Sequence, residues 1–215
     1  MRLQKIDSGS FRDHYYLEPS DHCYYVGEFT PYGGYSCSPT NQLIHNLKKS
    51  VSLKGTPQYV YKGKAIAEAG GQLRKVLNIH ADAFRQITFV PIPPSKAKTD
   101  PEYDDRMVQV LRHMGAGVAC DIRELVVQTN STQASHRSEQ RLKPAELEQL
   151  YSVDVTLQLP TPTNIGIVDD VLTAGAHYRA MKTVLGRHFP GVPIFGLFLA
   201  RSKRDADVWD DEEAI

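Results

Sequence analysis

The chain has 215 residues, enough for one large domain or for one domain with an accessory segment. A hydrophobic fraction of 41% supports a substantial core. The 25 basic and 25 acidic residues give a formal net charge of zero, which argues against a protein that coats nucleic acid, although a local basic patch stays open. Three cysteines without a CxxC pair and eight histidines without an HExxH motif disfavour a zinc site, a disulfide framework and a dedicated protein-bound metal.

The N-terminal stretch has no apolar segment typical of a signal peptide, and no apolar run approaches membrane-spanning length. Because the cysteines are few and widely spaced, a reducing compartment fits best. We therefore expect a cytoplasmic protein without a membrane partner.

The first elements in chain order lie in a stretch rich in Tyr, Gly, Pro and Ser. It predicts a strand over residues 24–29 and, after a loop, a short helix that Thr40 caps. Leu43, Ile44 and Leu47 share one face of that helix. Six tyrosines of this stretch either stack on the ring of a ligand or pack in the protein interior. They are Tyr15, Tyr16, Tyr24, Tyr25, Tyr32 and Tyr35.

The middle of the chain alternates helical and extended patterns. Apolar residues at helical spacing predict a helix over 64–77, and a β-branched run closed by prolines predicts a strand over 87–92. Asp100 followed by Pro101 predicts the start of a helix that ends at Gly115.

The last third continues this alternation. Residues 117–129 predict one or two short strands, and 135–151 predict a polar segment that is helical in pieces. A strand over 164–168, a helix over 176–188 and a final buried strand over 192–200 follow. Strands that alternate with helices imply an α/β fold with a parallel sheet and helices on both faces.

The composition suggests three segments. We expect residues 1–60 to form an N-terminal hood or flap, residues 61–204 to form the α/β core, and residues 205–215 to be a charged tail.

Two adjacent acids, Asp169 and Asp170, follow the predicted strand 164–168 and precede a glycine-bearing turn. Paired carboxylates cost desolvation and repel each other, so they indicate a bound ligand. Ligands of doubly wound sheets bind at the carboxyl ends of strands, where the N–H groups of a helix start attract anions. A ribose 5-phosphate fits, with its hydroxyls on the acids and its phosphate on the turn. The turn residues are Thr173, Ala174, Gly175, Ala176 and His177.

Two other interpretations of the acid pair stay open. One is a solvated turn at the end of a strand. The other is a receiver-type phosphoacceptor site with magnesium, which needs further acids after the first α/β strand. That strand ends in prolines instead.

A second polar segment, FVPIPPSKAK at 89–98, lies upstream. Ser95 and Lys96 offer a hydroxyl and a cation to a diphosphate, and Arg106 is a third candidate contact. The alternative is a surface loop followed by an exposed helix turn. Residues 133–141 either close over the ligand or form a polar surface helix.

The segment GIVDDVLTAGAH (166–177) resembles the phosphoribosyl pyrophosphate (PRPP) signature of type I phosphoribosyltransferases. Within that superfamily, LIHNLKK (43–49), VPIP (90–93) and LAR (199–201) are similar to segments of ComF-type proteins. The resemblance implies a type I phosphoribosyltransferase fold and transfer of the phosphoribosyl group from PRPP to an unidentified acceptor. It also implies that Mg²⁺ arrives with the diphosphate, and it leaves a homodimer open.

This chain departs from the family pattern at Ala174 and His177, where hydroxyl side chains are usual. A protonated His177 would restore one hydrogen bond to the phosphate. The departure keeps a second hypothesis open, in which the chain is a non-catalytic regulatory module or a ComF-like accessory protein in DNA uptake. Only this second hypothesis implies a nucleic-acid partner.

Overall fold

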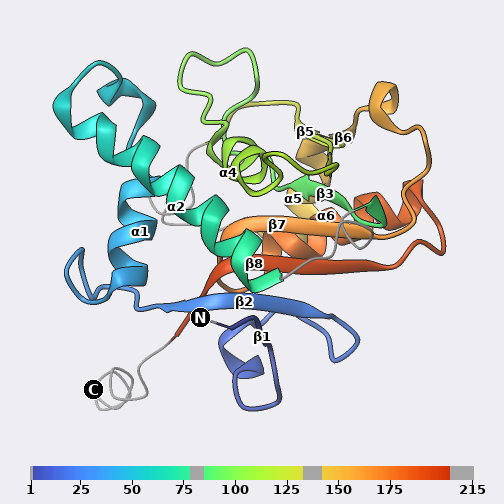
Figure 1. The fold of residues 1–215 in the computed structure, drawn as a ribbon. Coiled ribbons are helices and arrows are strands. Elements are labelled where there is room, and N and C mark those ends of the chain that lie inside the picture. Colours follow the sequence, from blue (N-terminus) through green and yellow to red (C-terminus); the bar gives the residue numbers. More distant parts are fainter. Residues whose placement is uncertain (1, 78–84, 133–141, 204–215) are drawn as a thin grey trace, which may run out of the picture.

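A mixed six-stranded sheet runs through the computed structural model, which describes residues 2–77, 85–132 and 142–203 (Figure 1). All neighbouring strands pair in parallel except the first, which is antiparallel to the second. In sheet order the strands are β1 (Gln4–Lys5), β2 (Cys23–Phe29), β8 (Ile194–Ser202), β7 (Ile165–Leu172), β3 (Thr88–Pro91) and β4 (Asp121–Ile122).

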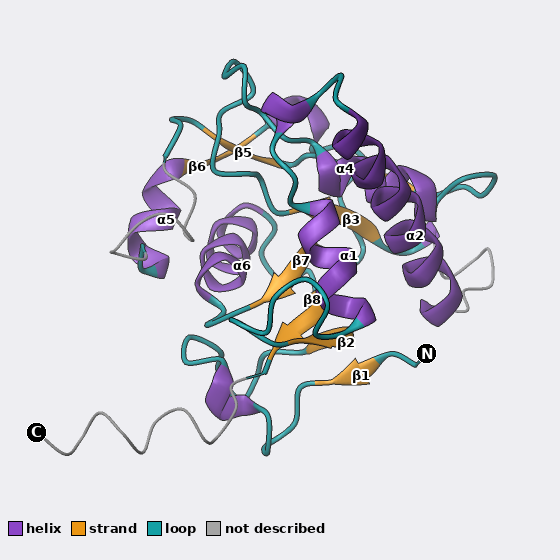
Figure 2. Ribbon diagram, turned by 90° about the vertical axis from the view of Figure 1, so that its left-hand side faces the viewer, coloured by secondary structure: helices purple, strands orange, loops and turns teal. Residues whose placement is uncertain are grey.

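Helices cover both faces of this sheet. Figure 2 shows α5 and α6 on one side of the strands and α1, α2 and α4 on the other. The helices are α1 (Pro39–Leu47), α2 (Val60–Leu77), α4 (Arg106–Met114), α5 (Pro144–Leu150) and α6 (Ala176–His188). A separate antiparallel pair is formed by β5 (Val126–Gln128) and β6 (Tyr151–Val153). The 3₁₀ turns are η1 (Phe11–Asp13), η2 (Val51–Leu53), η3 (Pro57–Tyr59) and η4 (Val155–Leu157).

The two helical layers pack on opposite sets of strand residues. On β7, Ile165 and Ile167 face α6, whereas Val168 belongs to the core under α1, α2 and α4. This division follows from the alternation of side chains along a strand. The chain is therefore an α/β protein with a mostly parallel mixed sheet flanked by helices, as the alternation of elements predicted.

Several predicted elements are confirmed with shifted ends, and two details are wrong. Ser38, not Thr40, caps α1, because its hydroxyl accepts a hydrogen bond from the Asn41 N–H at 3.0 Å. The helix expected from Asp100 begins only at Arg106. The Asp100 carboxylate instead accepts the N–H of Glu102 at 2.8 Å, which closes a local turn before the helix.

The first 60 residues do not stand apart from the core. Strand β2 lies inside the main sheet, where it pairs with β8 from Cys23 opposite Gly196 to Phe29 opposite Ser202. Helix α1 packs with α2 in the same apolar layer. The expected hood is therefore integrated into the sheet and its covering layer, while the tail 205–215 lies outside the described residues.

No helix within residues 2–77, 85–132 and 142–203 is long and apolar enough to cross a membrane.

Candidate functional site

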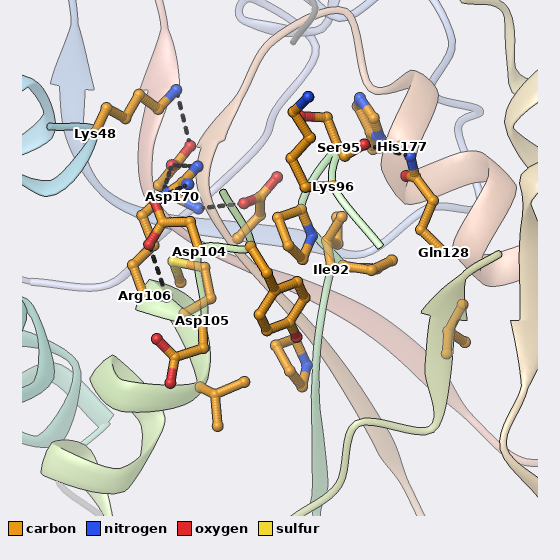
Figure 3. Close-up of a pocket in the computed structure, with 18 of the residues that line it drawn as sticks. Lys48, Ile92, Ser95, Lys96, Asp104, Asp105, Arg106, Gln128, Asp170 and His177 are labelled. Carbon is orange, nitrogen blue, oxygen red and sulfur yellow. Dashed lines mark hydrogen bonds and ion pairs between the residues drawn. The ribbon is translucent and has the colours of Figure 1, made fainter. Parts of the chain in front are cut away.

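A pocket of about 580 Å³ lies at the carboxyl ends of β3 and β7 (Figure 3). It is lined by nine of the ten residues that the sequence singled out as a site, all except Gly175. These nine are Ser95, Lys96, Arg106, Asp169, Asp170, Thr173, Ala174, Ala176 and His177. The structure thus brings together two segments separated by about 70 residues in the sequence, the loop after β3 and the turn after β7, because β3 and β7 are neighbouring parallel strands.

Asp170 is nearly fully buried and is held by two cations. Strand β7 extends to Leu172, so both acids lie within the strand rather than after it. One Asp170 oxygen is 3.0 Å from Lys48 Nζ, and the other accepts hydrogen bonds from Arg106 Nη2 at 2.8 Å and Nε at 3.1 Å. Burial alone would raise the pKa of Asp170, but Lys48 and Arg106 hold it well below its usual range.

The cations on Asp170 belong to a longer chain of ion pairs. Arg106 Nη1 donates to Asp104 Oδ2 at 2.9 Å, and the same oxygen accepts from Lys62 Nζ at 2.7 Å. Sequence analysis assigned no role to Lys48, Lys62 or Asp104. The sequence did carry a signal for Lys62. It lies three and four residues before Ala65 and Ile66, which places a lysine on the apolar face of α2.

Asp169 has a different environment from its neighbour. One of its carboxylate oxygens accepts the Asp170 backbone N–H at 2.8 Å, and within the described residues the other has no hydrogen-bond partner. Burial, and then the charge of Asp170, raise the pKa of Asp169 to about 7. Asp169 is thus a pocket carboxylate that lacks a full set of donors, and a ligand hydroxyl would supply one.

The turn after β7 is held from behind by the N-terminal segment. His14 Nδ1 donates to the Thr173 carbonyl at 2.5 Å, and the Tyr16 N–H donates to the Ala174 carbonyl at 2.8 Å. Gly175 has a φ of +89°, which favours glycine. In the described part of the chain, the backbone N–H groups of residues 174–178 have no hydrogen-bond acceptor. Such free N–H groups at a helix start attract anions.

His177 is uncharged near neutral pH. Its Nδ1 lies 2.7 Å from the Tyr151 hydroxyl, and burial lowers its pKa to about 4. The protonated His177 that the sequence suggested as a phosphate ligand therefore does not form at neutral pH, because the ring is removed from water. A neutral imidazole still donates one hydrogen bond.

The loop after β3 forms another wall of the pocket. The Ser95 carbonyl accepts hydrogen bonds from the Gln128 side chain and from the Thr132 N–H, both at 2.7 Å. Lys96 Nζ lies 3.7 Å from Asp100 and 3.5 Å from Glu102, so its charge is shared with two carboxylates. Gln128, which anchors this loop, is a pocket residue that sequence analysis missed.

Acidic side chains outnumber basic ones in the lining of the pocket. The basic residues are Lys48, Lys96, Lys98 and Arg106, and the acidic ones are Glu102, Asp104, Asp105, Glu124, Asp169 and Asp170. Residues 2–77, 85–132 and 142–203 contain no group of three or more His, Cys, Asp or Glu side chains arranged to hold a metal ion. An anionic ligand that brings its own divalent cation therefore fits this lining better than a bare anion does.

The sequence matches no protein-family model and no curated protein. Function is therefore inferred from the residues that the fold brings together in the pocket.

Proposed function

We propose that this chain is a phosphoribosyltransferase-like protein of the type I fold that resembles ComF-type proteins. It binds PRPP, or another ribose 5-phosphate ligand, together with Mg²⁺, and transfers the phosphoribosyl group to an acceptor. One observation carries the proposal: the Asp169–Asp170 pair borders the same pocket as Ala174, Ala176 and His177, whose backbone N–H groups have no acceptor within the described residues.

Each part of the ligand has a matching group in the pocket. The N–H groups of Ala174, Ala176 and His177 bind the 5-phosphate, and Asp169 accepts a ribose hydroxyl. Ser95, Lys96 and Arg106 face the diphosphate. The Mg²⁺ carried by the diphosphate neutralises the charge of its oxygens, which suits a lining rich in carboxylates.

The reaction is a displacement at the anomeric carbon with inversion. The bond from this carbon to pyrophosphate breaks, its electron pair leaves with pyrophosphate, and the acceptor forms the new bond and loses a proton. Positive charge develops on the sugar as the bond breaks. The Asp169 carboxylate, which pairs with no cation within the described residues, stabilises that charge, and it does so most strongly where water is excluded.

Calorimetric titration of PRPP with Mg²⁺ tests the proposal. We expect the wild type to bind, and Asp169→Asn to bind at least about tenfold more weakly, because charge-assisted hydrogen bonds contribute about 1.5–3 kcal/mol. Glu68→Gln is the matched control, since it removes one carboxylate from the exposed face of α2. Absence of binding by the wild type to both PRPP and ribose 5-phosphate, each titrated with Mg²⁺, would refute the proposal.

A second candidate is a non-catalytic module that senses a nucleotide or PRPP, or assists a nucleic-acid-processing partner. Two observations favour it: Ala174 contributes no hydroxyl to the turn, and both oxygens of Asp170 are already bound to Lys48 and Arg106. An acceptor screen separates the two, because a transferase releases pyrophosphate in the presence of its acceptor. A sensing module binds the ligand and releases none.

A further inference from the structure

Lys62 is a buried lysine outside the pocket. It is the third residue of α2, its side chain is 2% exposed, and its neighbours on the same face of the helix are Ala65, Ile66 and Ala69. A buried ammonium group is costly unless each of its donors has an acceptor. Its Nζ has three acceptors, at distances between 2.7 and 2.9 Å.

Two of these acceptors are backbone carbonyls at the end of α1. Lys62 Nζ donates to the carbonyl of Leu47 at 2.9 Å and to that of Lys49 at 2.7 Å. Lys48 lies between them, so Lys62 holds the backbone on both sides of the residue whose side chain reaches Asp170 at 3.0 Å. A cation at this position also stabilises the negative end of the α1 dipole.

The third acceptor, Asp104, connects Lys62 to Arg106, the second cation that contacts Asp170. Asp104 Oδ2 accepts from Lys62 Nζ at 2.7 Å and from Arg106 Nη1 at 2.9 Å. Arg106 then donates with its remaining groups, Nε and Nη2, to Asp170. Through Lys48 on one side and Asp104 on the other, Lys62 acts on both oxygens of the Asp170 carboxylate.

We propose that Lys62 is a positioning residue. Without touching the ligand, it holds Lys48 and Arg106 in contact with Asp170 and so fixes the positions of these three pocket residues. The effect on PRPP affinity rests on the function proposed above, whereas the effect on the Arg106–Asp170 contact does not. A residue that only joined α1 to α2 would affect stability and leave the Arg106–Asp170 contact unchanged in the folded protein.

The first test removes the charge of Lys62 and follows Arg106. Lys62→Met keeps a similar length without the ammonium, and Lys64→Met makes the same change at an exposed position of the same helix. The ¹⁵N-detected Nε–H signal of Arg106, assigned by its loss in Arg106→Lys, reports the hydrogen bond to Asp170.

We expect hydrogen exchange at Arg106 Nε–H to accelerate at least about tenfold in Lys62→Met and to stay at the wild-type rate in Lys64→Met. An unchanged rate in folded Lys62→Met overturns the proposal. If Lys62→Met does not fold, Lys62→Gln replaces it, because the amide offers two N–H donors to the α1 carbonyls while the ammonium opposite Asp104 is lost. The same acceleration is expected for Lys62→Gln, and its absence overturns the proposal equally.

Titration with PRPP and Mg²⁺ then measures the consequence for the pocket. Lys62→Met should weaken binding at least about tenfold, because Lys48 and Arg106 are no longer held in their pre-organised positions, and Lys64→Met should bind as the wild type does. Wild-type affinity in Lys62→Met overturns the positioning role. If the wild type itself binds neither PRPP nor ribose 5-phosphate, the proposed function fails, and the exchange at Arg106 still decides the role of Lys62.

Discussion

The Arg106 guanidinium donates two hydrogen bonds to a single oxygen of Asp170, from Nη2 at 2.8 Å and from Nε at 3.1 Å. This contact joins the first residue of α4 to β7 beneath the pocket. Arg106 and Lys48 neutralise Asp170, whereas no cation pairs with the adjacent Asp169 within the described residues. The two neighbouring carboxyls therefore have pKa values displaced in opposite directions.

The ion pair predicts a large stability loss when Arg106 is removed. Arg106→Met leaves the buried Asp170 carboxylate with Lys48 as its remaining cation, and breaking a buried pair typically costs about 3–5 kcal/mol. Urea unfolding at neutral pH measures this loss. Arg187→Met is the control. Arg187 is exposed and pairs with Glu148 at the surface, where an ion pair contributes at most about 1 kcal/mol. Equal losses in the two variants would contradict the buried role of Arg106.

The raised pKa of Asp169 predicts that the free energy of unfolding falls as the pH rises. Its pKa is raised from 3.8 to about 7 in the folded protein, so the unfolded chain loses this proton first, and the free energy of unfolding decreases between about pH 4 and pH 7. Asp169→Asn removes this decrease. We expect the variant to exceed the wild type by at least about 1 kcal/mol at pH 8, since one pKa unit corresponds to about 1.36 kcal/mol.

Unfolding of the wild type and Asp169→Asn at pH 4 and at pH 8 measures this difference. It should be largest at pH 8 and shrink toward pH 4. A gain in stability combined with a loss of PRPP binding is the pattern expected of a carboxylate kept for function rather than for folding. A difference that does not vary with pH would show that Asp169 is not the group that titrates.

Gly175 and Gly186, at opposite ends of α6, predict opposite effects of alanine. Gly175 has a φ of +89°, and an added Cβ would lie 3.0 Å from a methyl of Leu17, so Gly175→Ala should destabilise the protein by about 1–3 kcal/mol. Gly186 lies in the helix with open space around its Cα, so Gly186→Ala should stabilise it by about 0.5–1 kcal/mol. Thermal unfolding of both variants checks the contrast. Equal effects would mean that the turn at Gly175 does not need its left-handed backbone.

The hydrogen bond from His14 to Thr173 predicts that the N-terminal segment stabilises the turn after β7. His14→Leu leaves the Thr173 carbonyl without the donor at 2.5 Å, and such a loss costs about 1–3 kcal/mol. His14→Asn places an N–H near the position of Nδ1 and should recover part of the loss. The free energy of unfolding of the two variants tests the contact. Equal losses would assign the effect to the packing of His14 rather than to its hydrogen bond.

Much of the fold was predictable because its signals are local. Amphipathic spacing places the helix at 176–188, and α6 has these same ends. The start of α4 was not predictable in this way. Asp100 followed by Pro101 fits a helix start, but side-chain hydrogen bonds of Asp100 to Glu102 and Ser131 form a turn there instead.

The sequence by itself determined the alternation of strands and helices and the residues that end β3 and begin α6, since side-chain periodicity and turn chemistry act over a few residues. Only the tertiary structure decided which charges meet. Arg106 and Asp170 are 64 residues apart, and Lys62 reaches Asp104 across 42, because helix packing over the sheet creates these pairs. The charge of His177 was decided in the same way, since burial beside Tyr151 removes the ring from the water that would stabilise its protonated form.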